Sequence, residues 1–63
     1  MKRLAPGVYD DDEGGLHLDV GELLAANGWP DTPENRDTIV RAGQHMFGDR
    51  VEVTERTIEV TDG

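Results

Sequence analysis

Apolar residues recur at helical spacing over the longest patterned stretch of the chain, residues 31–48. They form one wide stripe that consists of Ile39, Val40, Ala42, Gly43, Met46 and Phe47. Thr32 can cap the N-terminus of this helix, and Pro33 suits the first helical position because its missing N–H would have no intrahelical partner. Gly48 can take the left-handed conformation that ends a helix. The pattern predicts one complete helix, whose stripe the rest of the chain must cover.

Two stretches before this helix have the character of β-strands: the first has some β-propensity, and the second alternates between apolar and polar residues. They are residues 7–10 and 16–20, and the acidic segment 11–15, which ends in paired glycines, lies between them. We expect a β-hairpin with a solvated acidic tip, since burying its carboxylates together would cost a prohibitive amount of free energy. The apolar residues of the second strand should face the core, and the polar residues between them should face away.

A short helix should follow the second strand directly. Asp19 and Glu22 have the spacing of a capping box, in which each side chain bonds the other residue's backbone N–H. Gly28 can end this helix in a left-handed conformation, and Trp29 then stands where a residue packs back onto the last turn. We therefore expect a helix over about residues 20–27 and a short connection to the long helix.

The C-terminal residues alternate again, but the parity of the pattern changes. Val51 and Val53 occupy odd positions, whereas Ile58 and Val60 occupy even ones. One straight strand would place the two pairs on opposite faces, so a bulge or turn near residues 55–56 is needed if all four are buried. The residues there do not favour a tight turn. We expect one strand before this point and a second strand or a loosely attached tail after it.

These elements predict one α+β domain over residues 1–63, with an N-terminal β-hairpin, two helices and one or two C-terminal strands. The strands should form an antiparallel sheet with the helices on one face. Residues 1–6 and 61–63 are expected to be mobile. The predicted core comprises Val8, Leu16, Leu18, Val20, Leu23, Leu24, Trp29, Ile39, Val40, Met46, Phe47, Val51 and Val53, with Ile58 and Val60 added if a second C-terminal strand forms.

Composition changes this picture mainly through charge. Fourteen acidic and six basic residues give a net charge of −8, so the chain should repel nucleic acid and anionic membranes and attract basic surfaces. The chain contains no cysteine, which excludes disulfides and thiolate metal sites. No apolar run approaches the ~20 residues that span a bilayer, and there is no signal-peptide pattern. We therefore expect a cytoplasmic protein that does not enter membranes.

Motifs for a metal site or for catalysis are incomplete or absent. The run from Asp10 imitates the start of an EF-hand loop, but Gly14 and Gly21 stand where the loop needs a ligand and a bidentate glutamate. His17 and His45 lie on different predicted elements, which disfavours zinc. The chain has neither serine nor cysteine as a nucleophile and no phosphate-binding loop. We predict no metal, no cofactor and no enzymatic activity.

Two helices joined by a short connection are also the parts of a helix-turn-helix unit. The first turns of its second helix would face DNA, but they carry Glu34 and Asp37 beside a single Arg36. DNA phosphates would be repelled rather than neutralised. Direct binding to nucleic acid is therefore not expected.

The acidic residues themselves are the candidate site. Alternate residues on a strand lie ~6.6 Å apart, close to the ~6–7 Å between phosphates that follows from the rise and radius of a DNA strand. Carboxylates on the strands, at the hairpin tip and in the first turns of the long helix could thus offer a phosphate-like field to a basic groove. The candidate partner-binding residues are Asp10, Asp11, Asp12, Glu13, Glu34, Asp37, Glu52, Glu55 and Glu59, and Asp31 and Asp62 add to the same field.

A chain of this size, with an Asp-Asp-Asp-Glu run at residues 10–13 and no catalytic motif, is similar to small acidic proteins of phages and mobile elements, including anti-CRISPR and DNA-mimic inhibitors. The resemblance implies a monomeric, non-enzymatic inhibitor of a protein's DNA-binding surface, and it transfers no role to a single residue. Our leading hypothesis is an acidic binding protein that masks a basic, nucleic-acid-binding surface of a partner protein. The alternative is an accessory or structural domain of a larger assembly, whose charge serves only solubility.

Overall fold

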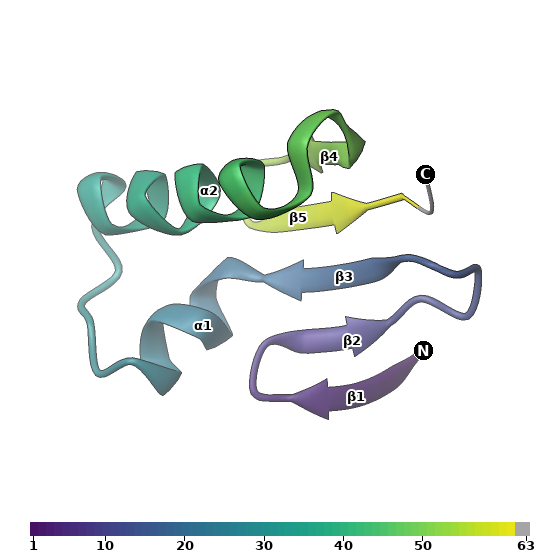
Figure 1. The fold of residues 1–63 in the computed structure, drawn as a ribbon. Coiled ribbons are helices and arrows are strands. Elements are labelled where there is room, and N and C mark those ends of the chain that lie inside the picture. Colours follow the sequence, from purple (N-terminus) through teal and green to yellow (C-terminus); the bar gives the residue numbers. More distant parts are fainter. Residues whose placement is uncertain (62–63) are drawn as a thin grey trace.

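The computed structural model describes residues 1–61, so the predicted mobility of residues 62–63 and the contribution of Asp62 to the acidic field lie outside this range. In chain order its elements are β1 (Lys2–Ala5), β2 (Val8–Asp10), β3 (Leu16–Asp19), α1 (Val20–Ala26), α2 (Pro33–Phe47), the 3₁₀ turn η1 (Gly48–Arg50), β4 (Val51–Val53) and β5 (Thr57–Val60). The five strands pair antiparallel in one sheet of order β1-β2-β3-β5-β4. α1 continues from β3, and α2 packs against α1, β4 and β5 (Figure 1). The predicted α+β fold, with helices on one face of an antiparallel sheet, is confirmed.

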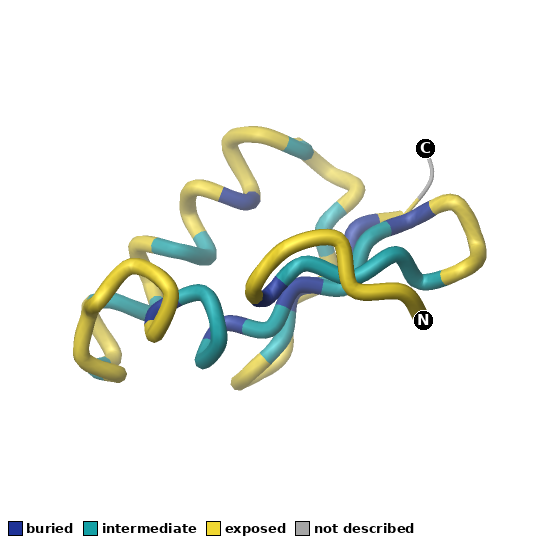
Figure 2. The backbone as a smooth tube through the Cα atoms, turned by 90° about the horizontal axis from the view of Figure 1, so that it is seen from below, coloured by how far each residue is buried: buried dark blue, intermediate teal, exposed yellow. Residues whose placement is uncertain are grey.

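The core lies where the two helices meet the central strands β3 and β5 (Figure 2). Its buried side chains are no more than 7% exposed and comprise Leu18, Val20, Leu24, Ile58 and Val60. The register sets Leu18 opposite Ile58 and Leu16 opposite Val60, so the apolar side chains of both strands share the face that the helices cover.

Three residues predicted in the core are exposed instead: Trp29 by 42%, Met46 by 72% and Val53 by 40%. Trp29 follows α1, and its backbone N–H donates to the carbonyl of Leu24 as predicted, but its indole is not buried. Val53 ends the edge strand β4, which has a neighbouring strand on one side only. Met46 lies on the side of α2 that does not face β4 and β5, as described below.

Residues 2–5, which we expected to be mobile, form the edge strand β1. Lys2 pairs with Asp10 and Arg3 with Tyr9, and the register shifts between Arg3 and Ala5. All four residues of β1 are exposed. Backbone hydrogen bonds to β2 therefore hold this strand, and these bonds leave no trace in the alternation of apolar residues.

The predicted helix ends are largely confirmed. Thr32 accepts a hydrogen bond from the N–H of Asn35 at 3.2 Å at the start of α2, and Asp19 accepts one from the N–H of Glu22 at 3.0 Å at the start of α1. Gly28 has φ +70° after α1. Gly48 ends α2 with a positive φ of +62°, but its ψ of −132° lies outside the predicted left-handed helical conformation. The capping box is only half formed, because the carboxylate of Glu22 turns away from Asp19 to other partners.

A turn at residues 54–56 produces the change of parity in the C-terminal pattern. The N–H of Thr54 donates to the carbonyl of Thr57 at 2.9 Å, and the N–H of Thr57 donates to the hydroxyl of Thr54 at 3.1 Å. β4 and β5 thus form a hairpin in which Val53 stands opposite Ile58. The second C-terminal strand exists, and a threonine side chain supplies the turn that Glu55 and Arg56 do not favour.

Candidate functional site

The structure divides the predicted acidic residues between two ends of the molecule. Six lie on the β2–β3 connection and on the neighbouring parts of β2, β4 and β5, and we call them the acidic end: Asp10, Asp11, Asp12, Glu13, Glu52 and Glu59. The others lie away from this connection: Glu34 and Asp37 are in the first turns of α2, at the far end of the ribbon (Figure 1), and Glu55 is in the β4–β5 turn, at the other end of the sheet. The predicted residues therefore do not form one continuous face.

Carboxylates of the acidic end shape the β2–β3 connection. Asp10 accepts a hydrogen bond from the N–H of Asp12 at 2.9 Å, and Asp11 accepts from the N–H groups of Glu13 at 2.8 Å and Gly15 at 2.9 Å. Asp10 and Asp11 are half-buried, whereas Asp12 and Glu13 are exposed. The tip is therefore only partly solvated, and the carboxylates of Asp10 and Asp11 hold it while that of Glu13 points to solvent.

Near the opposite end, arginines pair with two of the carboxylates, Asp31 and Asp37, but not with Glu34 or Glu55. Asp31 pairs with Arg36 at 3.4 Å and with Arg56 at 2.8 Å, and Asp37 pairs with Arg41 at 2.8 Å. Asp37 and Arg41 are four residues apart on α2, a spacing at which side chains of opposite charge meet on a helix. These ion pairs reduce the negative field around the start of α2.

The acidic end has no such neutralisation within residues 1–61, where neither a lysine nor an arginine forms an ion pair with its carboxylates. Asp12 bonds the amino group of Met1, and this hydrogen bond, with the negative charge of Asp12, raises the pKa of that amino group above its ordinary value. Glu59 bonds Nδ1 of His17. Within residues 1–61, the carboxylates of the acidic end that have no cationic partner are therefore those of Asp10, Asp11, Glu13 and Glu52.

A polar row crosses the uncovered face of the sheet. One residue from each strand contributes to it, namely Arg3, Tyr9, His17, Glu59 and Glu52. The rings of Tyr9 and His17 meet edge to face, with centroids 5.8 Å apart. Glu52 and Glu59 stand directly opposite each other, which is unfavourable for like charges.

Tyr9 is held by Glu22 rather than left free on this face. Its hydroxyl donates to both carboxylate oxygens of Glu22 at 2.8 Å, and the N–H of Gly7 donates to the same carboxylate at 3.1 Å. The hydrogen bond to Glu22, followed by burial and the charge of Glu22, raises the pKa of Tyr9 above its ordinary value. The carboxylate of Glu22, which does not complete the capping box, therefore links α1 to β2.

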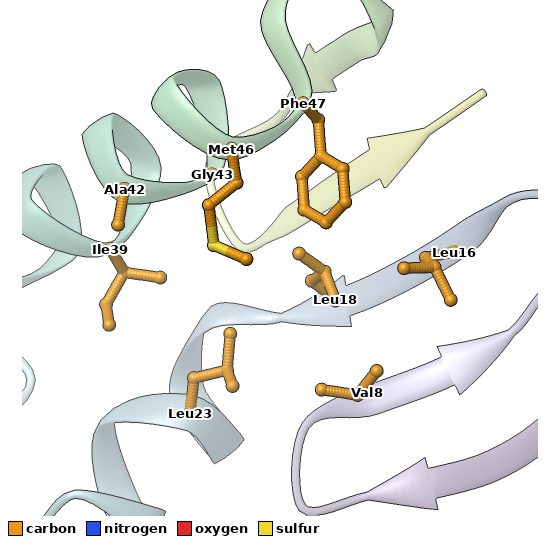
Figure 3. A pocket seen from close by; sticks show the side chains of 9 residues that line it. All are labelled: Val8, Leu16, Leu18, Leu23, Ile39, Ala42, Gly43, Met46 and Phe47. Atoms are coloured by element: carbon orange, nitrogen blue, oxygen red, sulfur yellow. The ribbon is translucent and has the colours of Figure 1, made fainter. Parts of the chain in front are cut away.

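An apolar groove opens between α2 and the β2–β3 part of the sheet (Figure 3). Its volume is about 340 Å³. Its lining comes from β2, β3, α1 and α2 and consists of Val8, Leu16, Leu18, Leu23, Ile39, Ala42, Gly43, Met46 and Phe47. Sequence reasoning assigned most of these residues to the core and so missed the groove. The sequence feature that indicates a groove is the width of the apolar stripe on the long helix, because this stripe is wider than two short strands can cover.

The groove exists because α2 covers only the part of the sheet that contains β4 and β5 and leaves the part with β2 uncovered. Its main contacts with the sheet are to β4 and β5, and the exposed strand β1 does not close the other side. Gly43 is buried against Ile58, while Ala42 and Met46 on the neighbouring rows remain exposed. The other members of the predicted stripe, Ile39, Val40 and Phe47, are partly buried against the core.

No protein-family model, curated protein or solved structure matches the chain. In the part that the structure describes, no helix is long and apolar enough to cross a membrane. Across residues 1–61 no group of three or more histidine, aspartate and glutamate side chains is arranged to hold a metal ion. Geometry and charge therefore carry the functional argument.

Proposed function

We propose that this protein is a monomeric, non-enzymatic acidic binding protein of the cytoplasm, which masks a basic, nucleic-acid-binding surface of a partner protein. The observation that carries the proposal is the charge density of the molecule. Eight net negative charges over a longest dimension of 31 Å correspond to one charge per about 3.9 Å. Such an excess of negative charge on so small a molecule attracts the basic surfaces that bind the phosphates of DNA.

The distribution of charge supports the same function. The acidic end lacks the arginine pairs found around the start of α2, so its field extends into solvent. Its tip is shaped by backbone hydrogen bonds to Asp10 and Asp11, so little conformational entropy is lost when a basic surface contacts Glu13. An anti-CRISPR-like or DNA-mimic inhibitor would act by occupying a cationic channel in this way.

Charge reversal at the two ends tests the proposal. The double variant Glu13→Lys/Glu52→Lys alters the acidic end without touching the carboxylates that shape its tip. The matched control, Glu34→Lys/Glu55→Lys, makes the same change in net charge at the opposite end. The partner is first captured from cells of the source organism, and DNA is then tested for competition with the protein.

We expect DNA to displace the protein from the captured partner. The acidic-end variant should bind the partner at least about tenfold more weakly and with a smaller dependence on salt. The control should lose much less affinity. Simultaneous binding of DNA and this protein to the partner would rule out masking. Equal losses of affinity for both variants would show that binding depends on the net charge of the protein and not on the acidic end.

A second candidate, an accessory domain of a larger assembly, is favoured by the apolar groove. Such a domain would bind through apolar contacts and would be insensitive to salt. Met46 is a better probe of this alternative than Tyr9, because it is 72% exposed whereas Tyr9 is half-buried and bonded to Glu22. Loss of a salt-insensitive partner on Met46→Gln would support it.

A further inference from the structure

The groove between α2 and the β2–β3 part of the sheet has the properties of a docking site. Its volume of about 340 Å³ is roughly twice that of the ~150 Å³ apolar cavity that accommodates benzene. It can therefore receive about two large aliphatic or aromatic side chains. In a chain with 32% charged residues, a continuous apolar lining on the surface indicates a place where a partner binds.

The chemistry of the lining restricts the occupant. Every lining side chain is apolar, and one lining residue is a glycine. A small polar ligand would find no polar side chain to fix its orientation. An extended peptide would find no free strand edge inside the groove, because β2 and β3 are already paired on both sides. A helix satisfies its own backbone and needs only apolar side chains to fill such a groove.

Charge complementarity decides between the remaining occupants. Leu16 lines the groove and pairs directly with Asp10, so the acidic end begins where the groove ends. Two copies of the chain, each with a net charge of −8, would repel each other. A partner segment that carries lysine or arginine next to its apolar residues is attracted instead.

We propose that the groove binds an amphipathic basic helix of the partner protein, with its apolar side chains between α2 and β3 and its basic side chains against residues 10–13. This inference rests on the proposed masking function and names the element of the partner that is recognised. The apolar contacts give binding strength that is independent of salt, and the acidic end supplies steering and selects for positive charge.

The probe is a synthetic helical peptide with leucines at the i, i+3, i+4 and i+7 positions of one face and lysines elsewhere. A second peptide carries glutamate in place of every lysine. The groove variant is Ala42→Glu, and its matched control is Ala25→Glu, which adds the same charge at another exposed helix position outside the groove lining. Titration calorimetry measures binding, and circular dichroism checks that each variant is folded.

The lysine peptide should bind and the glutamate peptide should not. Ala42→Glu should lower the affinity for the lysine peptide by about tenfold or more, although it adds attractive charge. Ala25→Glu should change this affinity by less than about twofold. Failure of the lysine peptide to bind, or equal binding of both peptides, overturns the proposal. A dimer in sedimentation that Ala42→Glu dissociates also overturns it, because the occupant is then a second copy.

The charge-reversed variant Glu13→Lys/Glu52→Lys separates this inference from the proposed function. If that variant weakens the lysine peptide and Ala42→Glu does not, binding is purely electrostatic at the acidic end. The groove inference then fails while masking stands. If neither variant weakens the binding of the lysine peptide, the groove inference fails, and masking is decided by the competition between DNA and this protein for the captured partner.

Discussion

Tyr9 is the single tyrosine of the chain, so its ionisation can be followed without interference from other phenols. Its pKa is raised in the folded state, chiefly by the hydrogen bond that its hydroxyl donates to Glu22. The folded protein therefore holds the phenol proton more tightly than the unfolded chain. The stabilisation is complete below the unfolded pKa of ~10 and is lost as the pH rises through the higher folded pKa.

Glu22→Gln should lower the pKa of Tyr9 toward its ordinary value, because a neutral amide accepts a weaker hydrogen bond from the phenol than a carboxylate does and carries no negative charge. Phenolate absorbance as a function of pH measures this pKa directly. Glu34→Gln is the control, since Glu34 lies on α2 and does not contact Tyr9, and it should leave the titration curve unchanged. An unchanged curve for Glu22→Gln would contradict the contact between β2 and α1.

Glu22 also shows where local sequence reasoning reaches its limit. The spacing to Asp19 predicts a capping box, and Asp19 does cap α1. The partners that Glu22 takes instead, Gly7 and Tyr9, are 15 and 13 residues away in the sequence. A spacing rule within one helix cannot weigh such partners, because they become neighbours only after β2 pairs with β3.

At the scale of elements, the helix ends could be predicted because they depend on neighbouring residues alone. Thr32 with Pro33, Gly28 and Gly48 each act within about four residues along the chain. The side of α2 that is covered could not be predicted in the same way. It depends on β5 entering the sheet between β3 and β4, which brings α2 over β4 and β5 and leaves the groove open.

Gly43 offers a test of how α2 packs on β5. It lies inside α2, where glycine costs ~1 kcal/mol relative to alanine. A Cβ atom at this position would lie 3.5 Å from Cδ1 of Ile58, which is an ordinary contact. Gly43→Ala should therefore raise the free energy of unfolding by about 0.5–1 kcal/mol in a urea titration.

Gly28→Ala is the matched control for this change. No atom lies within 4 Å of a Cβ at Gly28, but its φ of +70° is strained for alanine. The same substitution should therefore lower the free energy of unfolding by about 1 kcal/mol. A loss of stability for Gly43→Ala as well would mean that α2 lies too close to β5 for a methyl group.

At the scale of the whole molecule, the same charges that suit a basic partner oppose folding. Negative groups repel one another in the compact state, and this repulsion is screened by salt. The sequence predicts the net charge and its sign, and hence the class of partner. It does not predict that Arg56 joins Arg36 at Asp31, because that contact depends on where the β4–β5 turn lies in the fold.

Glu52 shows this conflict at one position, because it stands directly opposite Glu59 on the neighbouring strand. Glu52→Lys replaces a repulsive cross-strand pair with an attractive one and should stabilise the fold by about 0.2–1 kcal/mol. Glu55→Lys makes the same change in net charge in the exposed β4–β5 turn and should stabilise less. Urea titrations at low and high salt measure the difference in the free energy of unfolding.

If Glu52→Lys gains stability and loses partner binding while Glu55→Lys keeps binding, the repulsion between Glu52 and Glu59 serves binding rather than folding. A destabilised Glu52→Lys would instead show that this pair is not formed as described.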